Sequence, residues 1–376
     1  MRRRLCCALV LLLASPITAD NHTRGGLSTV GHWKNTIVIG THHKTGTVLF
    51  AKVFRVICKM MDVVRIKSNR TLHAMACGEL LSSFSPGVCI IEHVTARDVR
   101  DIEHRPPHEK PPFVHAVRDP VEMCVSAYQY HLLGPEPWLV QPMRDLNGST
   151  IQQYYQRLPP AEGVRFECLR MTLELVESAL VYNRTRRLPH VLTTRLEDFA
   201  KSYDATMREV FTFLGSGPHV EELVTASQVY DLARAPPQDA RHVSAASSKQ
   251  ALRDFLLHGD DPRLTHLLVG LRELLGYCHT NGSGECQSTD GPRHPKNHAH
   301  SSTLFSGRDA LCEELKLLCA TTRVGFFQWC SYGRIPRGRI PSLPDCGEAV
   351  VLGPGGKSKA TVSSPSGAKM LAHDGL

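Results

Sequence analysis

The sequence predicts an α/β protein with a central parallel sheet, followed by a small cysteine-rich C-terminal appendage. Three observations lead to this fold class. Between residues 35 and 280, short runs of β-branched and aromatic residues alternate with longer segments of helical periodicity, as in strands joined by crossover helices. Two of the strand segments end in a polar loop that leads directly into a helix. Six of the thirteen cysteines lie together, between residues 278 and 346.

Local patterns place the elements in order along the chain. Runs of apolar and β-branched residues predict strands at Thr36–Ile39, Val88–Val94, Phe113–Val117 and Val191–Arg195. Apolar residues at helical spacing predict helices at Thr47–Met61, Val121–Leu133, Phe166–Tyr182, Phe199–Leu214, His219–Ala233 and Asp261–Leu275. Gly215 ends the fourth of these helices, and the leucines of "LTHLLVGLRELLG" give the last one an apolar stripe.

Length and charge narrow the class of function. With 376 residues, 42% of them hydrophobic, the chain can bury one large core and something smaller. The net charge of +8 suits an anionic ligand. The sequence has no run of Lys and Arg interleaved with aromatic residues, so nucleic acid is not the expected partner.

The N-terminal segment has the pattern of a secretory signal. A basic start at Met1–Arg4 precedes an apolar run at Leu5–Ala14 and small residues up to Ala19. Because the apolar run is shorter than the ~20 residues that span a bilayer, we interpret residues 1–19 as a cleaved signal peptide, with a short uncleaved signal anchor as the alternative. Five of the seven asparagines begin glycosylation sequons, which favours a secreted or Golgi-lumenal glycoprotein; they are Asn21, Asn69, Asn147, Asn183 and Asn281.

Cysteine usage fits the same oxidising compartment. Cys6 and Cys7 lie in the signal segment, and eleven cysteines remain. The late cluster of six predicts disulfides whose connectivity the sequence leaves open. The five upstream cysteines match no zinc spacing, and we interpret them as small buried apolar residues; they are Cys58, Cys77, Cys89, Cys124 and Cys168.

The loop after the first predicted strand is the first feature that points to a ligand. Its residues are Thr41, His42, His43, Lys44, Thr45, Gly46 and Thr47. The backbone N–H groups of such a loop and the positive end of the following helix favour a phosphate, with Lys44 as a point cation and threonine hydroxyls as donors. The Walker order GxxxxGK[ST] is not met, because Lys44 precedes Gly46.

A second polar motif follows the predicted strand at Phe113–Val117. It reads R-D-P-x5-S and places Arg118 at the strand end and Ser126 about two turns into the next helix, which Pro120 suits as a first residue. An arginine and a hydroxyl in this arrangement can bind a second phosphate together. Taken alone, Arg118 and Asp119 read as a local ion pair at a strand end.

Together the two motifs, [ST]-x-x-K-[ST]-G-T and R-D-P-x5-S, resemble the cofactor motifs of the sulfotransferase family, which uses 3′-phosphoadenosine 5′-phosphosulfate (PAPS). A later segment, "RLEDFAKSYDATMREVFTFLG", resembles the late core of that family. The resemblance covers residues 34–280 as a sulfotransferase domain. It implies a P-loop-like three-layer core and sulfuryl transfer from PAPS to an acceptor hydroxyl, without a metal. Residues 41–47 would then bind the 5′-phosphosulfate, Arg118 and Ser126 the 3′-phosphate, and Lys44 would stabilise charge on the leaving oxygen.

The acceptor must lose a proton, and the strand between the two motifs ends in two candidate bases. His93 occupies a place similar to that of the catalytic histidine of cytosolic sulfotransferases, and Glu92 is the next candidate. Many Golgi glycan sulfotransferases use a glutamate on the helix after the phosphate loop, but positions 48–61 contain no Glu or Asp. In sulfotransferases a late basic segment closes over the 3′-phosphate, and the candidates here are Arg241, Ser248 and Lys249.

Composition assigns the rest of the chain. Residues 281–303 read as a linker, 304–346 as the cysteine-rich appendage and 347–376 as a disordered tail. The expected acceptor is a hydroxyl of a glycan or of another secretory-pathway substrate, and a membrane is a partner only if the N-terminal segment is uncleaved. Two other functions stay open, a nucleotide kinase-like P-loop enzyme, which the broken Walker pattern disfavours, and a catalytically inactive secreted binding protein on the same fold.

Overall fold

The computed structural model describes most of the predicted main domain. The described residues are residue 33 and residues 35–68, 77–78, 80–81, 86–134, 136–143, 146–231, 233–234, 246–280 and 286–288. The predicted signal segment at 1–19, the appendage at 304–346, the tail at 347–376, most of the linker at 281–303, and Arg241 lie outside these residues. No helix within the described ranges is both long enough and apolar enough to cross a membrane.

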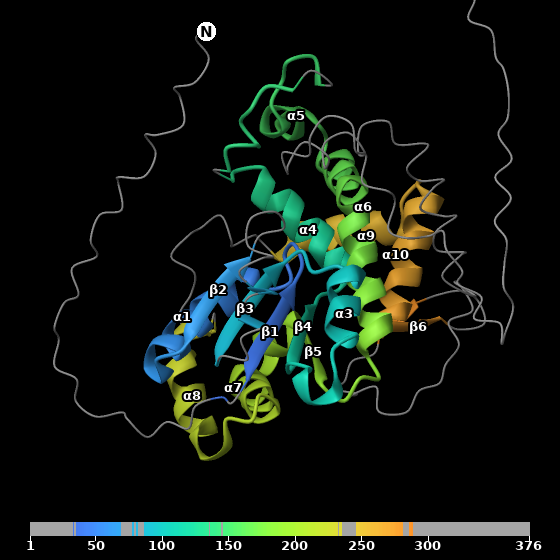
Figure 1. Cartoon of the computed structure of the whole chain (residues 1–376). Helices are drawn as coiled ribbons and strands as arrows, with labels where there is room; N and C mark the ends of the chain where they lie inside the picture. The colour runs from blue at the N-terminus through green and yellow to red at the C-terminus, as the bar shows by residue number, and fades with distance from the viewer. Residues whose placement is uncertain are drawn as a thin grey trace, which may run out of the picture. The chain divides into compact units, whose positions relative to one another are not determined.

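Five parallel strands form the central sheet, which confirms the predicted α/β class (Figure 1). In the order β2-β3-β1-β4-β5, their bounds are Val64–Ser68, Gly87–Glu92, Thr36–Thr41, Phe113–Val117 and Val191–Arg195. The four predicted strands are all present, and the edge strand β2 is additional. Its sequence "VRIKS" alternates apolar and basic residues, a pattern too short to separate from the end of the preceding helix.

The strand β1 lies at the centre of the sheet, paired with β3 on one side and with β4 on the other. The register places Thr41 beside Glu92, so β1 and β3 end level with each other. The chain first builds β2 and β3 on one side of β1 and then crosses to the other side for β4 and β5. In parallel sheets, ligands commonly bind at such a reversal, at the carboxyl ends of the strands. The two polar motifs follow β1 and β4, and therefore both lie at this edge of the sheet.

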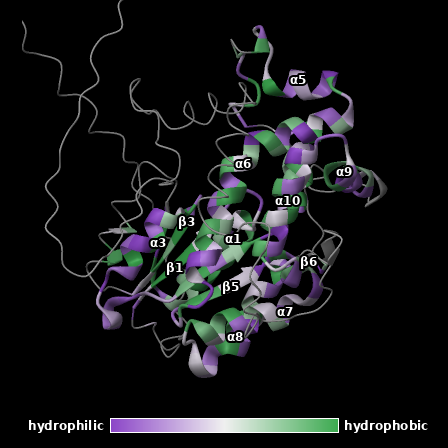
Figure 2. Ribbon diagram, turned by 90° about the vertical axis from the view of Figure 1, so that its right-hand side faces the viewer, coloured by the Kyte–Doolittle hydropathy of each residue, from purple (hydrophilic) through white to green (hydrophobic). Residues whose placement is uncertain are grey.

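Helices cover both faces of the sheet and complete the predicted three-layer core (Figure 1). They are α1 (Thr47–Met61), α7 (Leu196–Phe213) and α8 (Val220–Ser227) on one face, and α3 (Ala96–Glu103) and α6 (Pro160–Thr185) on the other. Ile37 and Ile39 of β1 pack in the core of the first face, whereas Val38 packs in the core of the second. This alternation follows from the two-residue period of a strand, and Figure 2 shows the strands coloured largely as hydrophobic, as expected for a sheet buried on both faces.

A further group of helices packs against α6 in a separate core. The remaining elements are α4 (Pro120–His131), α5 (Ile151–Arg157), α9 (Ala246–His258), α10 (Pro262–Leu274), the antiparallel pair β6 (Cys278–Thr280) and β7 (Cys286–Ser288), and 3₁₀ turns at Pro107–Glu109, Gly217–His219 and Gln228–Tyr230. The helix α4 begins at Pro120, one residue before the predicted start, because the Asp119 carboxylate accepts the N–H of Val121 at 2.9 Å and caps it. The strand β7 lies within the segment predicted as a linker.

Two disulfides correct the interpretation of the upstream cysteines as unpaired apolar residues. Cys77 pairs with Cys89, and Cys124 on α4 pairs with Cys168 on α6. Cys58 is buried and free, and burial raises the pKa of its thiol to about 12, which makes it unreactive. The pairings were not readable from the sequence because the tertiary fold alone brings these segments together. The second disulfide ties the helix of the R-D-P-x5-S motif to α6.

Removal of the cross-link between α4 and α6 is expected to destabilise the domain. The double variant Cys124→Ala/Cys168→Ala should lower the free energy of unfolding by about 2 to 4 kcal/mol, because the bond restricts the unfolded chain. The cysteines are 44 residues apart in sequence. Urea denaturation without reductant measures the change, and Cys58→Ala is the matched control, since it removes a buried thiol without a cross-link. A double variant as stable as the parent protein contradicts this expectation.

Candidate active site at the carboxyl ends of β1, β3 and β4

The loop after β1 is held by hydrogen bonds among its own residues. The Thr45 hydroxyl accepts the N–H of His42 at 2.7 Å and donates to the His42 carbonyl at 3.0 Å. The Thr47 hydroxyl lies 2.9 Å from the Thr41 hydroxyl and 3.3 Å from the His42 carbonyl. Thr41, His42 and Thr45 are buried. These side chains therefore stabilise the conformation of the loop. The sequence suggested the Thr45 hydroxyl as a phosphate donor, but in the structure it forms hydrogen bonds with the His42 backbone instead.

Two residues of this loop have a left-handed backbone. Gly46 has φ 105° and Lys44 has φ 63°. Glycine adopts this conformation freely, whereas at Lys44 it costs ~1 to 2 kcal/mol. Arg118 contributes to holding it, because its Nη1 donates to the Lys44 carbonyl at 3.2 Å. Gly46 stands at the N-terminus of α1, which no side chain caps, so the positive end of this helix is not covered by a side chain of its own.

The Lys44 side chain lies against the helix α4. Its Nζ is 3.3 Å from the centre of the Tyr130 ring, a cation–π contact. Burial lowers the pKa of Lys44 to about 8, with Glu136 acting in the opposite direction. A bound anion favours the charged form of a lysine. Lys44 is therefore a cation that a phosphate or sulfate group in this loop would stabilise.

Arg118 stands at the end of β4 and joins the second motif to the first. Its hydrogen bond to the Lys44 carbonyl spans 74 residues of sequence. The guanidinium also lies 3.8 Å from the carboxylates of Glu122 and Glu197, a separation too long for strong hydrogen bonds. Arg118 is largely buried, and its contacts with the two carboxylates are weak. Its N–H groups can therefore donate to a phosphate that binds beside it.

Ser126 lies between the two cations on one face of α4. Glu122, Ser126 and Tyr130 are spaced four residues apart, so they share a helix face that extends over ~12 Å. Glu122 is near Arg118 at one end of this face, and Tyr130 contacts Lys44 at the other. All three side chains are partly exposed. The face therefore suits an elongated ligand that carries an anionic group at each end.

The late basic segment contacts the helix of the R-D-P-x5-S motif through Arg253, a residue that the sequence did not single out. Arg253 of α9 forms an ion pair with Glu122 of α4. Ser248 is exposed and Lys249 partly buried at the start of α9. Arg253 follows Lys249 by four residues and therefore lies on the same face of the helix. This spacing from the predicted Lys249 could have identified Arg253 from the sequence.

The two candidate bases face different partners. The Glu92 carboxylate lies 2.7 Å from the Lys67 Nζ on β2. The Nδ1 of His93 lies 2.8 Å from the Oε1 of Glu174 on α6, and the imidazole is 30% exposed. Glu92 is thus paired with a lysine on the edge strand, whereas the Nδ1 of His93 is paired with a carboxylate and the imidazole is partly exposed.

A left-handed backbone is found at two of the three positions that the sequence named as catalytic, Lys44 and His93, and not at Glu92. Lys44, Asp62, His93 and Asn147 are the non-glycine residues with positive φ among those described. Asp62 ends α1, and Asn147 precedes Gly148 in a turn, two settings in which this conformation is common. Lys44 and His93 have neither explanation. Residues held in such a conformation cluster at functional sites.

Glu174 is the residue in this region that sequence reasoning missed. Its Oε1 accepts the N–H of His43 at 3.0 Å as well as the Nδ1–H of His93, and it lies 3.5 Å from the His42 Nδ1. His42 in turn pairs with the buried His115, with their Nε2 atoms 3.0 Å apart. Although burial acts in the other direction, His93 and His42 hold the pKa of Glu174 well below its usual range. No local pattern marks this glutamate, which lies inside a long helix.

A second buried cluster stands beside the loop. Arg170 donates to both carboxylate oxygens of Glu167, at 2.6 and 3.1 Å, and the Nδ1 of His131 lies 3.1 Å from the same carboxylate. Tyr155 also donates to it. The His43 ring stacks on that of His131, with centroids 5.2 Å apart. Burial lowers the pKa of His43 well below its ordinary value, and His131 and Lys44 add to this effect. The His43 imidazole is therefore uncharged near neutral pH.

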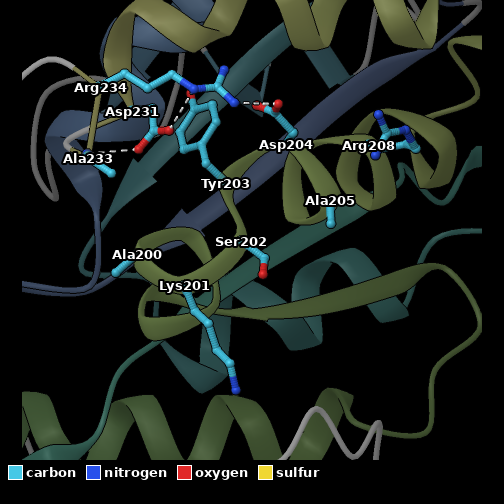
Figure 3. A pocket seen from close by; sticks show the side chains of 10 residues that line it. All are labelled: Ala200, Lys201, Ser202, Tyr203, Asp204, Ala205, Arg208, Asp231, Ala233 and Arg234. Atoms are coloured by element: carbon cyan, nitrogen blue, oxygen red, sulfur yellow. Dashed lines mark hydrogen bonds and ion pairs between the residues drawn. The ribbon is translucent and has the colours of Figure 1, made fainter.

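A hollow of about 370 Å³ lies away from these residues, on α7 (Figure 3). It is found where Ser202 leaves the helical conformation, with φ −151° and ψ 64°. Ion pairs between Arg234 and the carboxylates of Asp204 and Asp231 line it. None of the predicted site residues lines this hollow.

Comparison with known proteins adds one distant likeness. The chain is similar to a solved structure described as mouse sulfotransferase SULT7A1 complexed with PAP, at 14% sequence identity and a TM-score of 0.38, over 64% of this chain and 89% of that chain. No protein-family model matches the chain, and neither does any curated protein.

Proposed function

We propose that this protein transfers a sulfuryl group from PAPS to an acceptor hydroxyl. One observation carries the proposal. Arg118 of the R-D-P-x5-S motif donates to the carbonyl of Lys44 in the T-x-x-K-T-G-T loop, so the two motifs form one site at the carboxyl edge of the sheet. The groups around it fit the donor, with a lysine and an uncapped helix N-terminus at one end and an arginine beside Ser126 at the other.

Each residue has a role in this reaction. PAPS supplies a sulfuryl group whose bond to the 5′-phosphate oxygen breaks as the acceptor oxygen bonds to sulfur. Lys44 stabilises the negative charge that develops on the leaving phosphate oxygen. His93 takes the acceptor proton on its Nε2, because its Nδ1 donates to Glu174. Arg118 and Ser126 bind the 3′-phosphate, and the backbone after Lys44 binds the 5′-phosphate.

The compartment that we propose is the secretory pathway, as a Golgi-lumenal or secreted protein. Two disulfides within the described domain fit an oxidising compartment. Asn147 and Asn183, two of the five sequon asparagines, are exposed and accessible to glycosylation. We therefore propose a hydroxyl of a glycan, or of another molecule in that pathway, as the acceptor.

Transfer of labelled sulfate from PAPS to a panel of polysaccharides, peptides and lipids tests the proposal. We expect transfer to at least one polysaccharide in the presence of a metal chelator. Transfer of phosphate from ATP that requires magnesium would instead identify a kinase-like enzyme. Tight binding of 3′-phosphoadenosine 5′-phosphate without transfer to any acceptor would identify a binding protein on the same fold.

Arg118→Ala is expected to act on nucleotide binding. The dissociation constant of 3′-phosphoadenosine 5′-phosphate should rise by ~10- to 100-fold, because the variant loses a charge-assisted contact to a phosphate. Isothermal titration calorimetry measures it. Arg208→Ala is the matched control, since Arg208 is an exposed arginine paired with Glu221. Equal affinity in the Arg118 variant and the parent protein would contradict the assignment.

The affinity for this nucleotide should also depend on pH. Burial holds the pKa of Lys44 near 8, so the free protein loses this charge as the pH rises through 8. An anionic ligand binds the protonated form better, and binding should therefore weaken between pH 7 and pH 9. Calorimetry across this range measures the slope. In Lys44→Met, which has no charge to lose, the slope should be smaller, and an unchanged slope would contradict the role of Lys44.

A further inference from the structure

Glu174 is a buried carboxylate whose contacts converge on the candidate base and on the phosphate loop. A single oxygen, Oε1, lies 2.8 Å from the His93 Nδ1, 3.0 Å from the His43 backbone nitrogen and 3.5 Å from the His42 Nδ1. The glutamate side chain is 2% exposed. Its partner His93 directly follows β3 and is 81 residues distant in sequence, and His43 in the loop after β1 is 131 residues distant.

The chemistry of the contact fixes the proton on His93. An ionised carboxylate only accepts hydrogen bonds, so the Nδ1 of His93 carries the hydrogen, and in the neutral ring the Nε2 is the basic nitrogen. The same carboxylate accepts a backbone N–H from His43, next to Lys44. A displacement of Glu174 would therefore move the base and the phosphate loop together.

The partners of Glu174 also differ from those of Glu167, another buried glutamate of α6. Glu167 is paired with the guanidinium of Arg170 as well as with His131. Within the described part of the chain, both ion pairs of Glu174 are with histidines. Its charge is therefore balanced most fully when an imidazole is protonated, which is the state that a histidine reaches after it accepts a proton from a substrate.

We propose that Glu174 is the positioning residue of the active site, which sets the tautomer and orientation of His93 and couples them to the phosphate loop. This inference rests on the proposed function for its catalytic meaning, but the proton on His93 can be measured without a substrate. Among the described residues, other titratable groups near His93 are the stacked ring of His43, with centroids 6.5 Å apart, and Glu92, whose carboxylate is paired with Lys67.

Glu174→Gln tests the proposal, because glutamine keeps the shape and an accepting oxygen but removes the charge. Glu177→Gln is the matched control. Glu177 is also a buried glutamate of α6, one turn further on, and its carboxylate accepts the N–H of Ala96 at 3.1 Å. Both variants lose one buried carboxylate from the same helix, so a purely structural role predicts the same outcome for both.

The primary readout is the ¹⁵N spectrum of the full-length protein labelled at histidine, with His93 assigned from the spectrum of His93→Asn. We expect protonated Nδ1 and unprotonated Nε2 in the parent protein and in Glu177→Gln, and an increased fraction of protonated Nε2 in Glu174→Gln. The second readout is the pH profile of sulfuryl transfer. In Glu174→Gln we expect kcat to fall by ~10- to 100-fold at an unchanged KM for PAPS, and the acidic limb to move to lower pH, because the carboxylate no longer stabilises the imidazolium.

The spectrum and the rate separate the two ideas. Protonated Nε2 on His93 in the parent protein, or the same tautomer and pH profile in both glutamine variants and the parent, overturns the positioning role. Protonated Nδ1 in a protein that transfers no sulfate supports the positioning of His93 by Glu174 and overturns the proposed function instead.

Discussion

Lys44→Ala is expected to lower kcat by ~100-fold or more while the protein stays folded. In the proposed mechanism, this loss corresponds to the removal of one charge contact to the oxygen that becomes negative in the transition state. The position of the residue supports this role. Lys44 has a strained backbone conformation of the kind found at functional sites, and its Nζ is held against the Tyr130 ring. Rates under saturating PAPS and acceptor measure the effect.

Lys52→Ala provides the control for this variant. Lys52 is an exposed lysine on α1, so its removal changes the net charge by the same amount but leaves the site intact. We expect its rate to stay within a factor of about two of the parent rate, since exposed substitutions have small effects. A Lys44 variant that turns over as fast as the Lys52 variant would remove Lys44 from the mechanism.

His93→Asn is expected to lower the transfer rate by ~100- to 10,000-fold, the usual contribution of a general base. Asparagine is chosen because it tolerates the left-handed backbone that His93 adopts, with φ 58°. The affinity for 3′-phosphoadenosine 5′-phosphate should not change, because in the proposed mechanism the imidazole acts on the acceptor, whereas Lys44 and Arg118 bind the phosphates. Calorimetry and single-turnover rates separate the two effects.

His104→Asn is the matched control, since His104 is an exposed histidine at the end of α3. If His93→Asn remains active, the base is another group, and Glu92→Gln becomes the informative variant. In the structure Glu92 pairs with Lys67, so a catalytic Glu92 would first have to leave this partner. Weakened nucleotide binding in His93→Asn would mean that the histidine contacts the donor instead of the acceptor.

Local sequence patterns predicted the parts of the fold that depend on neighbours in the chain. The strand β1, its loop and α1 have the predicted order, because apolar runs and a glycine with positive φ are encoded within a few residues of one another. The start of α6 was predicted too late, at Phe166 instead of Pro160, since its first two turns mix polar and apolar residues. The strand β2 was missed because its five residues carry too short a pattern.

The candidate site divides in the same way. Lys44, His93 and Arg118 were named from motifs that each lie within a short segment. Glu174 and Arg253 belong to helices without a motif, and they meet the site only because α6 and α9 pack against the strand ends and α4. The disulfide between α4 and α6 was hidden for the same reason.

The sequence by itself determined the α/β class, the two polar motifs and their places at the ends of strands, because strand period, helix period and turn residues act over a few neighbours. The tertiary structure decided which groups meet. It brought Arg118 within hydrogen-bonding distance of the Lys44 carbonyl and His93 within hydrogen-bonding distance of the Glu174 carboxylate. It also paired the Glu92 carboxylate with Lys67. These pairings depend on the strand order β2-β3-β1-β4-β5 and on the packing of α4 and α6, which join segments far apart in sequence and leave no local pattern to read.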